Sequence, residues 1–176
     1  MIAVAGYASV LVALGASVKL TWDGWKAGRG TGDPAAVRRD AAVLLAAAGA
    51  AFLLLELAII THDFSIEYVA SNTATTTPFV FLLAAGWAAL EGSIVLWGLV
   101  LAGFTYLVAR RLNSVDGLGT MAVAVLGIVA VFWFGMMATV SDPFGVCTET
   151  LGGQCIASSV NPFAAAVAPA VGVGPN

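Results

Sequence analysis

Residues 41–60 read AAVLLAAAGAAFLLLELAII, a run in which Glu56 is the single charged residue. An α-helix needs roughly 20 apolar residues to cross a bilayer, because each residue adds about 1.5 Å to its length. Three further stretches are similarly apolar, namely 1–18, about 79–108 and about 118–140. The sequence therefore predicts an all-α polytopic membrane protein, with four transmembrane helices in a membrane region that spans residues 1–140.

The composition excludes several classes of protein. Apolar residues make up 60% of the 176 residues and charged residues only 10%, against about a quarter in an average soluble domain. Such a chain could not bury its apolar surface in water, so a cytosolic globular enzyme and a disordered protein are excluded. A basic face for binding nucleic acid is also absent from the sequence. Two cysteines and one histidine are too few for a zinc site, so no metal site is expected.

The basic residues predict the orientation, because cytoplasmic loops carry an excess of Lys and Arg. All seven lie in segments 19–39 and 109–116, and they are Lys19, Lys26, Arg29, Arg38, Arg39, Arg110 and Arg111. We therefore expect both segments to be cytoplasmic and both termini to be extracytoplasmic, in a multi-pass protein of the cell (inner) membrane. No basic residue precedes Lys19, so we interpret the first stretch as a retained helix rather than a signal peptide.

Two segments are expected on the extracytoplasmic side. Residues 62–77 form a loop whose first half carries apolar and aromatic residues, and it is predicted to be amphipathic and to lie on the membrane surface. Residues 141–176 hold four of the six prolines, so we expect an irregular tail. Within it, Cys147 and Cys155 are candidates for a disulfide, with glycines 152–153 as the turn. Two free thiols or a redox-active pair are the alternatives.

Two carboxylates lie inside the predicted spans, where a charge costs at least about 2.5 kcal/mol. We expect Glu91 to lie deep in the third span, with the indole of Trp87, one helical turn earlier, donating to it. Glu91 then either fixes helix register by packing or handles a ligand or a proton. Glu56 lies close to the expected outer boundary, so it is predicted to reach headgroups or water. The sole histidine, His62, is expected to be an ordinary surface residue.

Two longer motifs carry a family resemblance. Residues 63–72 read DFSIEYVASN and resemble the D-F-S-V-x-Y-V-A-x-N stretch of the CcmF family of cytochrome c haem lyases. Residues 87–97 read WAALEGSIVLW and resemble that family's W-G-x-H-E-G-S-L-L-L-W. Residues 161–163 are similar to the family's N-P-F segment. The resemblance extends along the whole chain, yet it covers only the N-terminal part of the family.

The residues that match these motifs are Trp87, Glu91, Gly92, Ser93, Trp97, Asp63, Phe64 and Tyr68. The resemblance implies that they shape and pack the lyase scaffold, and it assigns no catalytic residue among them. The family's histidine beside the glutamate is Leu90 here, so any role of that imidazole cannot be transferred. Residues 141–160 resemble an insertion, so the resemblance does not support the disulfide.

The resemblance implies that the chain is the N-terminal portion of a membrane-bound cytochrome c haem lyase. Such a lyase acts with a haem chaperone and other maturation subunits on the outer face. It attaches haem covalently to the C-x-x-C-H thiols of apocytochrome c. The complete protein holds haem b, whose ligands are expected outside this chain, so no cofactor is expected here. The chain is then a truncated or split lyase that is inactive alone.

Two other hypotheses remain open. A small membrane subunit of a proton- or ion-translocating complex would use Glu91 and Glu56 as relay carboxylates. A scaffold subunit would only recruit partners within the membrane. A relay requires the carboxylates alone, so the two longer motifs favour the lyase.

Overall fold

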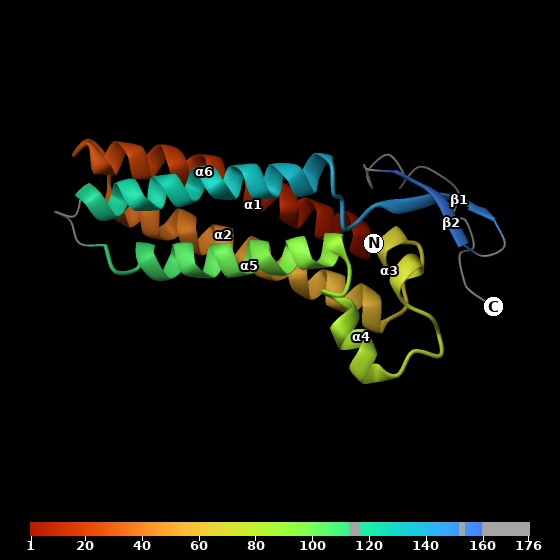
Figure 1. Ribbon diagram of the computed structural model, residues 1–176. Helices are drawn as coiled ribbons and strands as arrows, with labels where there is room; N and C mark the ends of the chain where they lie inside the picture. Colours follow the sequence, from red (N-terminus) through yellow and green to blue (C-terminus); the bar gives the residue numbers. More distant parts are fainter. Residues whose placement is uncertain (113–116, 152–153, 160–176) are drawn as a thin grey trace.

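The computed structural model describes residues 1–112, 117–151 and 154–159, and four long helices form an elongated bundle (Figure 1). They are α1 (Ile2–Gly28), α2 (Pro34–Ile60), α5 (Leu90–Ala109) and α6 (Gly117–Thr139). Each is long and apolar enough to cross a membrane, which confirms the predicted class of an all-helical protein with four candidate spans.

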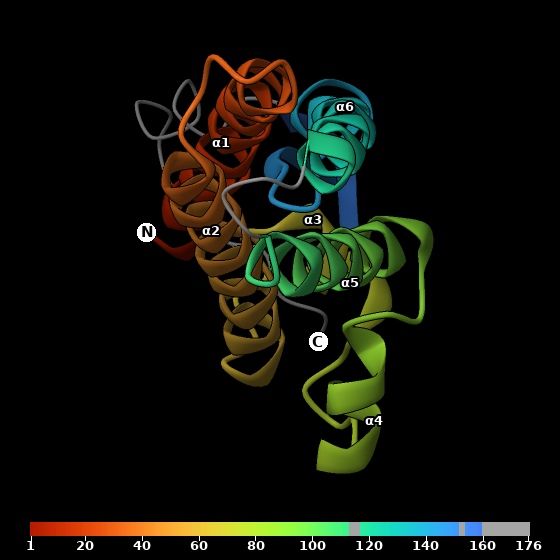
Figure 2. The ribbon, with the colours of Figure 1, turned by 90° about the vertical axis from the view of Figure 1, so that its left-hand side faces the viewer.

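The remaining elements gather at one end of the bundle, beside the start of α1 (Figure 1). They are helices α3 (Glu67–Asn72) and α4 (Phe79–Ala85) and strands β1 (Val146–Leu151) and β2 (Gln154–Ser159). We call this the hairpin end. The opposite end, where residues 29–33 connect α1 to α2, is the turn end. Viewed along the bundle, α4 projects away from the four long helices (Figure 2).

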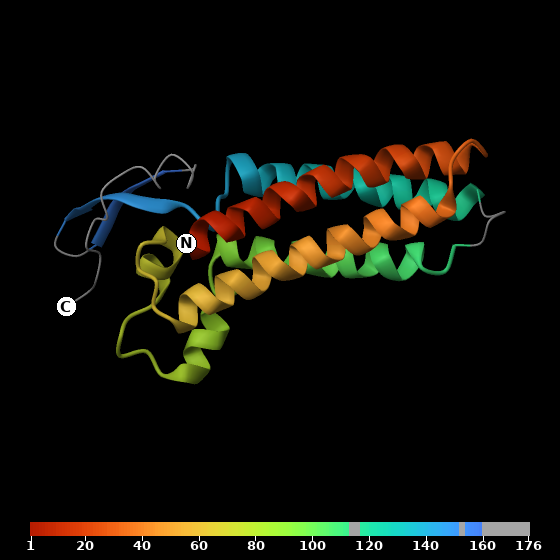
Figure 3. The same cartoon turned by 180° about the vertical axis from the view of Figure 1, so that it is seen from behind.

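The first two spans are longer than predicted, and the connection between them is shorter. The first helix continues ten residues beyond 18, to Gly28, and the second begins at Pro34 rather than at 41. Gly30 turns the chain with a φ of 75°, and the Asp33 side chain caps α2 by accepting from the Ala35 amide at 2.8 Å. The two helices then run antiparallel (Figure 3). Most charged residues of segment 19–39 therefore lie in helices. Ion pairs between Lys and Asp side chains compensate several of these charges there.

Small residues let the long helices approach closely, as is usual between membrane helices. Gly24 and Gly127 bring α1 against α6, because a Cβ on either would press on Ala124 or Thr21 respectively. Large apolar side chains point outward instead, including Leu53, Phe104 and Phe132, each at least 63% exposed. The bundle thus has small residues at its contacts and apolar residues on a surface suited to lipid.

The predicted third span, 79–108, is two helices rather than one. Helix α4 ends at Ala85, and α5 begins at Leu90 after an extended Ala89 with φ −118° and ψ 174°. The hydroxyl of Tyr68 donates to the Ala85 carbonyl at 2.6 Å, and the Ser93 hydroxyl donates to the Trp87 carbonyl at 2.8 Å. These bonds give a partner to carbonyls that an unbroken helix would pair internally, so the break does not leave either carbonyl unpaired.

The expectation of an irregular tail from residue 141 is wrong for residues 146–151 and 154–159. Strands β1 and β2 pair antiparallel, with Cys147 opposite Ser158 and Thr150 opposite Cys155, and Cys147 is bonded to Cys155. The strands lie between the prolines at 143 and 162, so the composition of the whole tail concealed them. The expected turn at 152–153 and the segment 161–163 lie outside the described residues.

Candidate functional site

A polar pocket of about 160 Å³ lies at the hairpin end of the bundle. Helix α3, the first turn of α5 and the segment between α6 and β1 form its walls. The lining residues are Glu67, Tyr68, Ser71, Asn72, Glu91, Val140, Ser141, Asp142 and Gly145. Three of them are carboxylates, so the pocket combines negative charge with hydroxyl and amide groups.

Backbone bonds hold the walls of the pocket together. The Glu67 amide donates to the Gly145 carbonyl at 2.9 Å, and the Cys147 amide donates to the Ser65 carbonyl at 3.0 Å. Phe144 is fully buried and lies against Gly6 of α1, where any Cβ would overlap its ring. The chain before α3 and the chain after α6 are therefore joined to each other and to the start of α1.

Asp142 is the most perturbed acid of the pocket. Its Oδ1 accepts from the Phe144 amide at 2.9 Å, whereas its Oδ2 and the Ser141 hydroxyl are buried without a partner among the described residues. Burial raises the pKa of Asp142 to about 7, and the charge of Glu67 adds to this, against the lowering effect of the Phe144 amide. The carboxyl of Asp142 is therefore harder to ionise than that of an ordinary aspartate.

Glu91 lies in the first turn of α5 and lines this pocket, so the expectation that it lies deep in a span is wrong. The helix break moves it to the end of the bundle, where the positive end of the α5 dipole favours a carboxylate. Trp87 lies in the break and not one turn earlier on the same helix, and its side chain is 47% exposed. The hydrogen bond expected from Trp87 to Glu91 assumed that both residues lie one turn apart on the same helix, and they do not.

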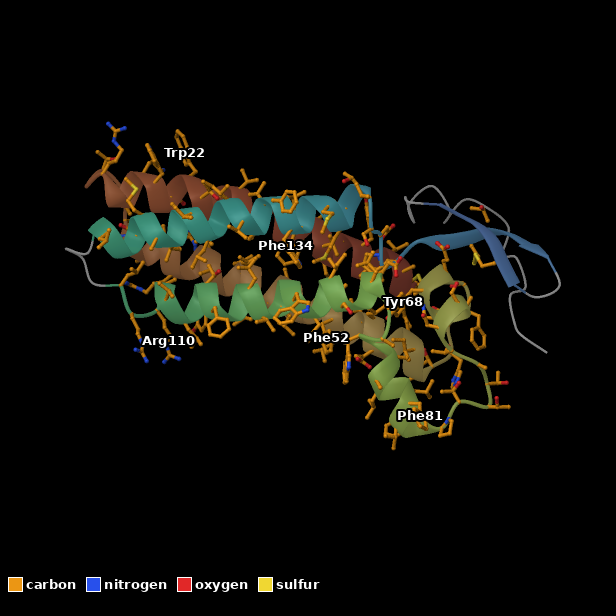
Figure 4. The ribbon with its side chains drawn as sticks, in the orientation of Figure 1. Trp22, Phe52, Tyr68, Phe81, Arg110 and Phe134 are labelled. Atoms are coloured by element: carbon orange, nitrogen blue, oxygen red, sulfur yellow. A yellow bond between two sulfur atoms is a disulfide. The ribbon has the colours of Figure 1, made fainter. Side chains whose placement is uncertain are left out.

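The two motifs of the sequence meet at Tyr68 and Gly92. Any Cβ on Gly92 would overlap the hydroxyl of Tyr68 and the carbonyl of Gly86. Tyr68 is buried, and burial raises the pKa of its hydroxyl above the ordinary value, which keeps it a donor to Ala85. Figure 4 shows Tyr68 where α3 meets the end of α5. Gly92 thus serves a close approach between the two motifs.

Other motif residues lie away from the pocket. Asp63 closes a turn by accepting from the hydroxyl of Ser65 at 2.5 Å and from its amide at 3.3 Å. Phe64 is part of the buried core, and Trp97 is 60% exposed on the side of α5. The structure therefore brings Tyr68, Glu91, Gly92 and Ser93 to one place and leaves Asp63, Phe64 and Trp97 outside it.

Glu56 was expected to reach toward headgroups or water, and this expectation is wrong. Both of its carboxylate oxygens are buried, and neither has a hydrogen-bond partner in the described part of the chain. The carboxyl lies against Gly86, at the start of the helix break. Glu56 is therefore enclosed by protein between α2 and the α4–α5 break.

The described residues do not fit a haem or a metal ion. They contain no group of three or more His, Cys, Asp or Glu side chains placed to hold a metal. His62 has a φ of 53°, its ring packs edge-on against Phe64 at 5.7 Å, and its buried Nε2 lacks a partner within the described ranges. It does not line the pocket, and the pocket lining offers no imidazole, thiolate or thioether as an axial haem ligand.

Sequence reasoning did not select Glu67, Ser141 or Asp142 as site residues. Glu67 stands inside the first motif, between Ile66 and Tyr68, so its position was a usable signal. Ser141 and Asp142 follow the fourth span directly, but only the fold shows that this point returns to α3. Residues that are distant in sequence therefore complete the pocket.

Comparisons with known proteins find relatives of one kind. No known protein-family model matches the chain. The chain is similar to the cytochrome c-type biogenesis protein CcmF of Pseudomonas fluorescens, with 37% identity over 97 residues, 53% of this chain and 14% of the relative. It is 35% identical to the CcmF protein of Escherichia coli K12 over 111 residues, 62% of this chain and 17% of the relative. It is 30% identical to CcmF of Haemophilus influenzae over 147 residues, which are 82% of this chain and 23% of the relative.

A solved structure is also similar to this chain. The structure of a cytochrome c haem lyase CcmF shares its fold with a TM-score of 0.75 and 39% sequence identity. The match covers 82% of this chain and 25% of the solved chain. The chain thus spans less than a quarter of the length of these curated relatives and a quarter of the solved one.

Proposed function

The chain belongs to the CcmF family of cytochrome c biogenesis proteins, and we propose that it forms the N-terminal membrane portion of a cytochrome c haem lyase. In this role it acts in the covalent attachment of haem to the C-x-x-C-H thiols of apocytochrome c. The haem supplies most of the reactivity, and the protein supplies binding and orientation. The haem ligands are expected outside this chain.

One observation carries the proposal. The two motifs that resemble the family are in direct contact through Tyr68 and Gly92, and both contribute to the same polar pocket through Tyr68 and Glu91. A chain that used these motifs only for helix packing would not need to gather them around a cavity. The pocket is therefore the best-supported place for contact with a partner or substrate.

We further propose that the hairpin end faces the extracytoplasmic side of the cell (inner) membrane. The seven basic residues lie in segments 19–39 and 109–116, toward the turn end and toward the connection of α5 to α6. Because cytoplasmic loops carry an excess of Lys and Arg, this side of the bundle is then cytoplasmic. A disulfide between Cys147 and Cys155 suits an oxidising compartment. In this orientation the pocket faces the compartment that holds apocytochrome c and the haem chaperone, and the remaining maturation subunits assemble around the bundle.

The alternative of an ion-translocating subunit has less support. A relay across a membrane needs ionisable groups spaced along the spans. No Asp, Glu, Lys, Arg or His lies in residues 41–55 of α2, in residues 92–109 of α5 or anywhere in α6. Glu56 and Glu91 lie near the same end of the bundle, so they do not connect the two membrane faces.

The test replaces Gly92 with Ala in the gene that encodes this chain. We expect the amount of cytochrome c with covalent haem to fall several-fold, because the added methyl overlaps the Tyr68 hydroxyl. Gly103→Ala, on the same helix, is the matched control, since nothing lies within 4 Å of a Cβ there. An immunoblot of the chain normalises both values. Unchanged haem attachment in Gly92→Ala, at an equal level of chain, would contradict the proposed function.

A further inference from the structure

Glu56 is a half-buried residue whose enclosed carboxyl the stability of the bundle does not explain. Its two oxygens are enclosed without a hydrogen-bond partner among the described residues. Burying a polar group without such a bond is unfavourable, and the cost is greater inside a membrane helix. An apolar side chain at this position of α2 would avoid that cost. Residues that break a local rule in this way are most often found at functional sites.

The carboxyl of Glu56 occupies a specific space. Gly86 has no side chain, and a Cβ there would overlap Oε1 of Glu56. Gly86 is the first residue after α4, so the acid lies at the beginning of the helix break. Across the break, the carbonyl of Gly86 lies close to Gly92. Glu56, Gly86 and Gly92 therefore form one continuous contact from α2 to the pocket.

Tyr68 holds the break from the opposite direction. Its hydroxyl donates to the Ala85 carbonyl, one residue before the glycine that Glu56 contacts. The shape of the break determines where α5 begins, and Glu91 is the second residue of α5. Any shift at Gly86 therefore moves Glu91 and Gly92 relative to the pocket.

We propose that Glu56 is a positioning residue of the lyase, whose carboxyl fills the space beside Gly86 and so places Glu91 and Gly92 at the pocket. This inference rests on the proposed function. It assigns Glu56 no contact with substrate and no transfer of a proton. What matters is the length and shape of the side chain, so Gln is expected to replace it and Leu, whose branches end one bond earlier, is not.

The contact is tested first by a cycle of substitutions measured as thermal unfolding of the purified chain in detergent. Gly86→Ala is expected to lower the Tm, because the methyl overlaps the Glu56 carboxyl. Glu56→Ala combined with Gly86→Ala is expected to recover most of that loss, since the methyl then has room. Gly103→Ala, in α5, is again the control for a glycine-to-alanine change, since a Cβ there meets nothing within 4 Å. Additive effects of the two substitutions would overturn the contact on which the proposal is built.

The positioning role is tested by haem attachment per amount of chain. We expect Glu56→Gln to retain nearly the full level of cytochrome c with covalent haem, and Glu56→Leu to lose several-fold while its Tm stays equal or rises. Loss in Glu56→Leu with an intact fold cannot come from destabilisation. The proposal is overturned if Glu56→Leu attaches haem normally, or if Glu56→Gln loses as much as Glu56→Leu. If Gly92→Ala also leaves attachment unchanged, it is the proposed function that fails, and the Tm cycle still reports on the contact.

Discussion

The two ends of the bundle differ in whether their enclosed carboxylates are paired with a cation. At the turn end, Asp23 and Asp40 are both buried, and the ammonium of Lys19 lies 2.6 Å from the former and 2.7 Å from the latter. Lys26 adds a further pair to Asp23 at 2.9 Å. At the hairpin end, Glu56 and Asp142 have buried oxygens with no partner among the described residues.

This difference distinguishes acids that stabilise the fold from acids that serve a function. An acid that is paired with cations from its own and a neighbouring helix joins α1 to α2, and it needs no further explanation. An acid that is enclosed without a partner costs stability, and its presence indicates a use other than folding. The hairpin end is also where the two family motifs meet, so both lines of argument point to the same part of the molecule.

The largest effect is expected from breaking the paired end. Lys19→Ala leaves Asp40 with Arg39, at 3.7 Å, as its one ion-pair partner among the described residues. It should reduce the free energy of unfolding by about 2 kcal/mol, below the usual cost of a broken buried pair because Lys19 is half-exposed. Thermal unfolding in detergent measures this.

Lys26→Ala is the control at the same end. Asp23 then keeps Lys19 as its partner, so the loss should be much smaller. If Lys26→Ala costs as much as Lys19→Ala, the turn end is not held by the shared lysine. In both variants haem attachment should follow the amount of folded chain and nothing more.

A second, smaller effect separates packing from function within the hairpin end, where both Tyr68 and Tyr7 lie. Tyr68→Phe removes the donor to the Ala85 carbonyl, which should cost about 1–2 kcal/mol of stability. Tyr7→Phe is a close match, because Tyr7 donates to the Ala138 carbonyl at 3.0 Å. We expect the two variants to lower the Tm alike, whereas only Tyr68→Phe lowers haem attachment per amount of chain. Equal attachment in both would mean that Tyr68 acts only in packing.

The smallest effect concerns the pH dependence of the hairpin end. The pKa of Asp142 is about 7 in the folded chain, above the ordinary 3.8, so the folded state holds the proton more tightly than the unfolded state. The associated stability is fully present below about pH 4 and is lost as the pH rises through about 7. Asp142→Asn keeps this group neutral, so its Tm should exceed that of the wild type at pH 8 by more than at pH 5.

Ser141→Ala is the control for this pH effect, because it alters the same pocket without removing a titrating group. Its Tm should change with pH as the wild type does. A Tm difference between Asp142→Asn and the wild type that is the same at both pH values would show that Asp142 does not carry the pH dependence.

The sequence could predict the spans but not the break within one of them. Hydropathy measures how apolar a segment is, and residues 79–108 are largely apolar with Glu91 as the single charged residue, so hydropathy does not mark Gly86 as the end of a helix. The break depends on Tyr68, which approaches Ala85 from another element. For the same reason the depth of Glu91 was predicted wrongly, since it was placed by counting along one continuous helix. Glu56 was placed correctly near the end of α2, but its enclosure beside Gly86 depends on the same break.

The motifs predicted the site better than the chemistry of single residues did. Tyr68, Glu91, Gly92 and Ser93 were selected by resemblance, and they lie together at the break. Asp142 could not be selected, because its burial and its neighbour Glu67 come from the return of the chain after α6. A sequence read in one dimension contains the motifs, whereas a pocket depends on contacts between distant segments.

The most direct measurement of the central claim is the amount of covalent haem on c-type cytochromes in cells from which the gene for this chain has been removed. Haem staining of denatured membrane and periplasmic proteins reports it, and an immunoblot of the apocytochrome controls for synthesis. We predict that attachment is lost and that returning the intact gene restores it. Normal attachment in cells without the gene would contradict the account.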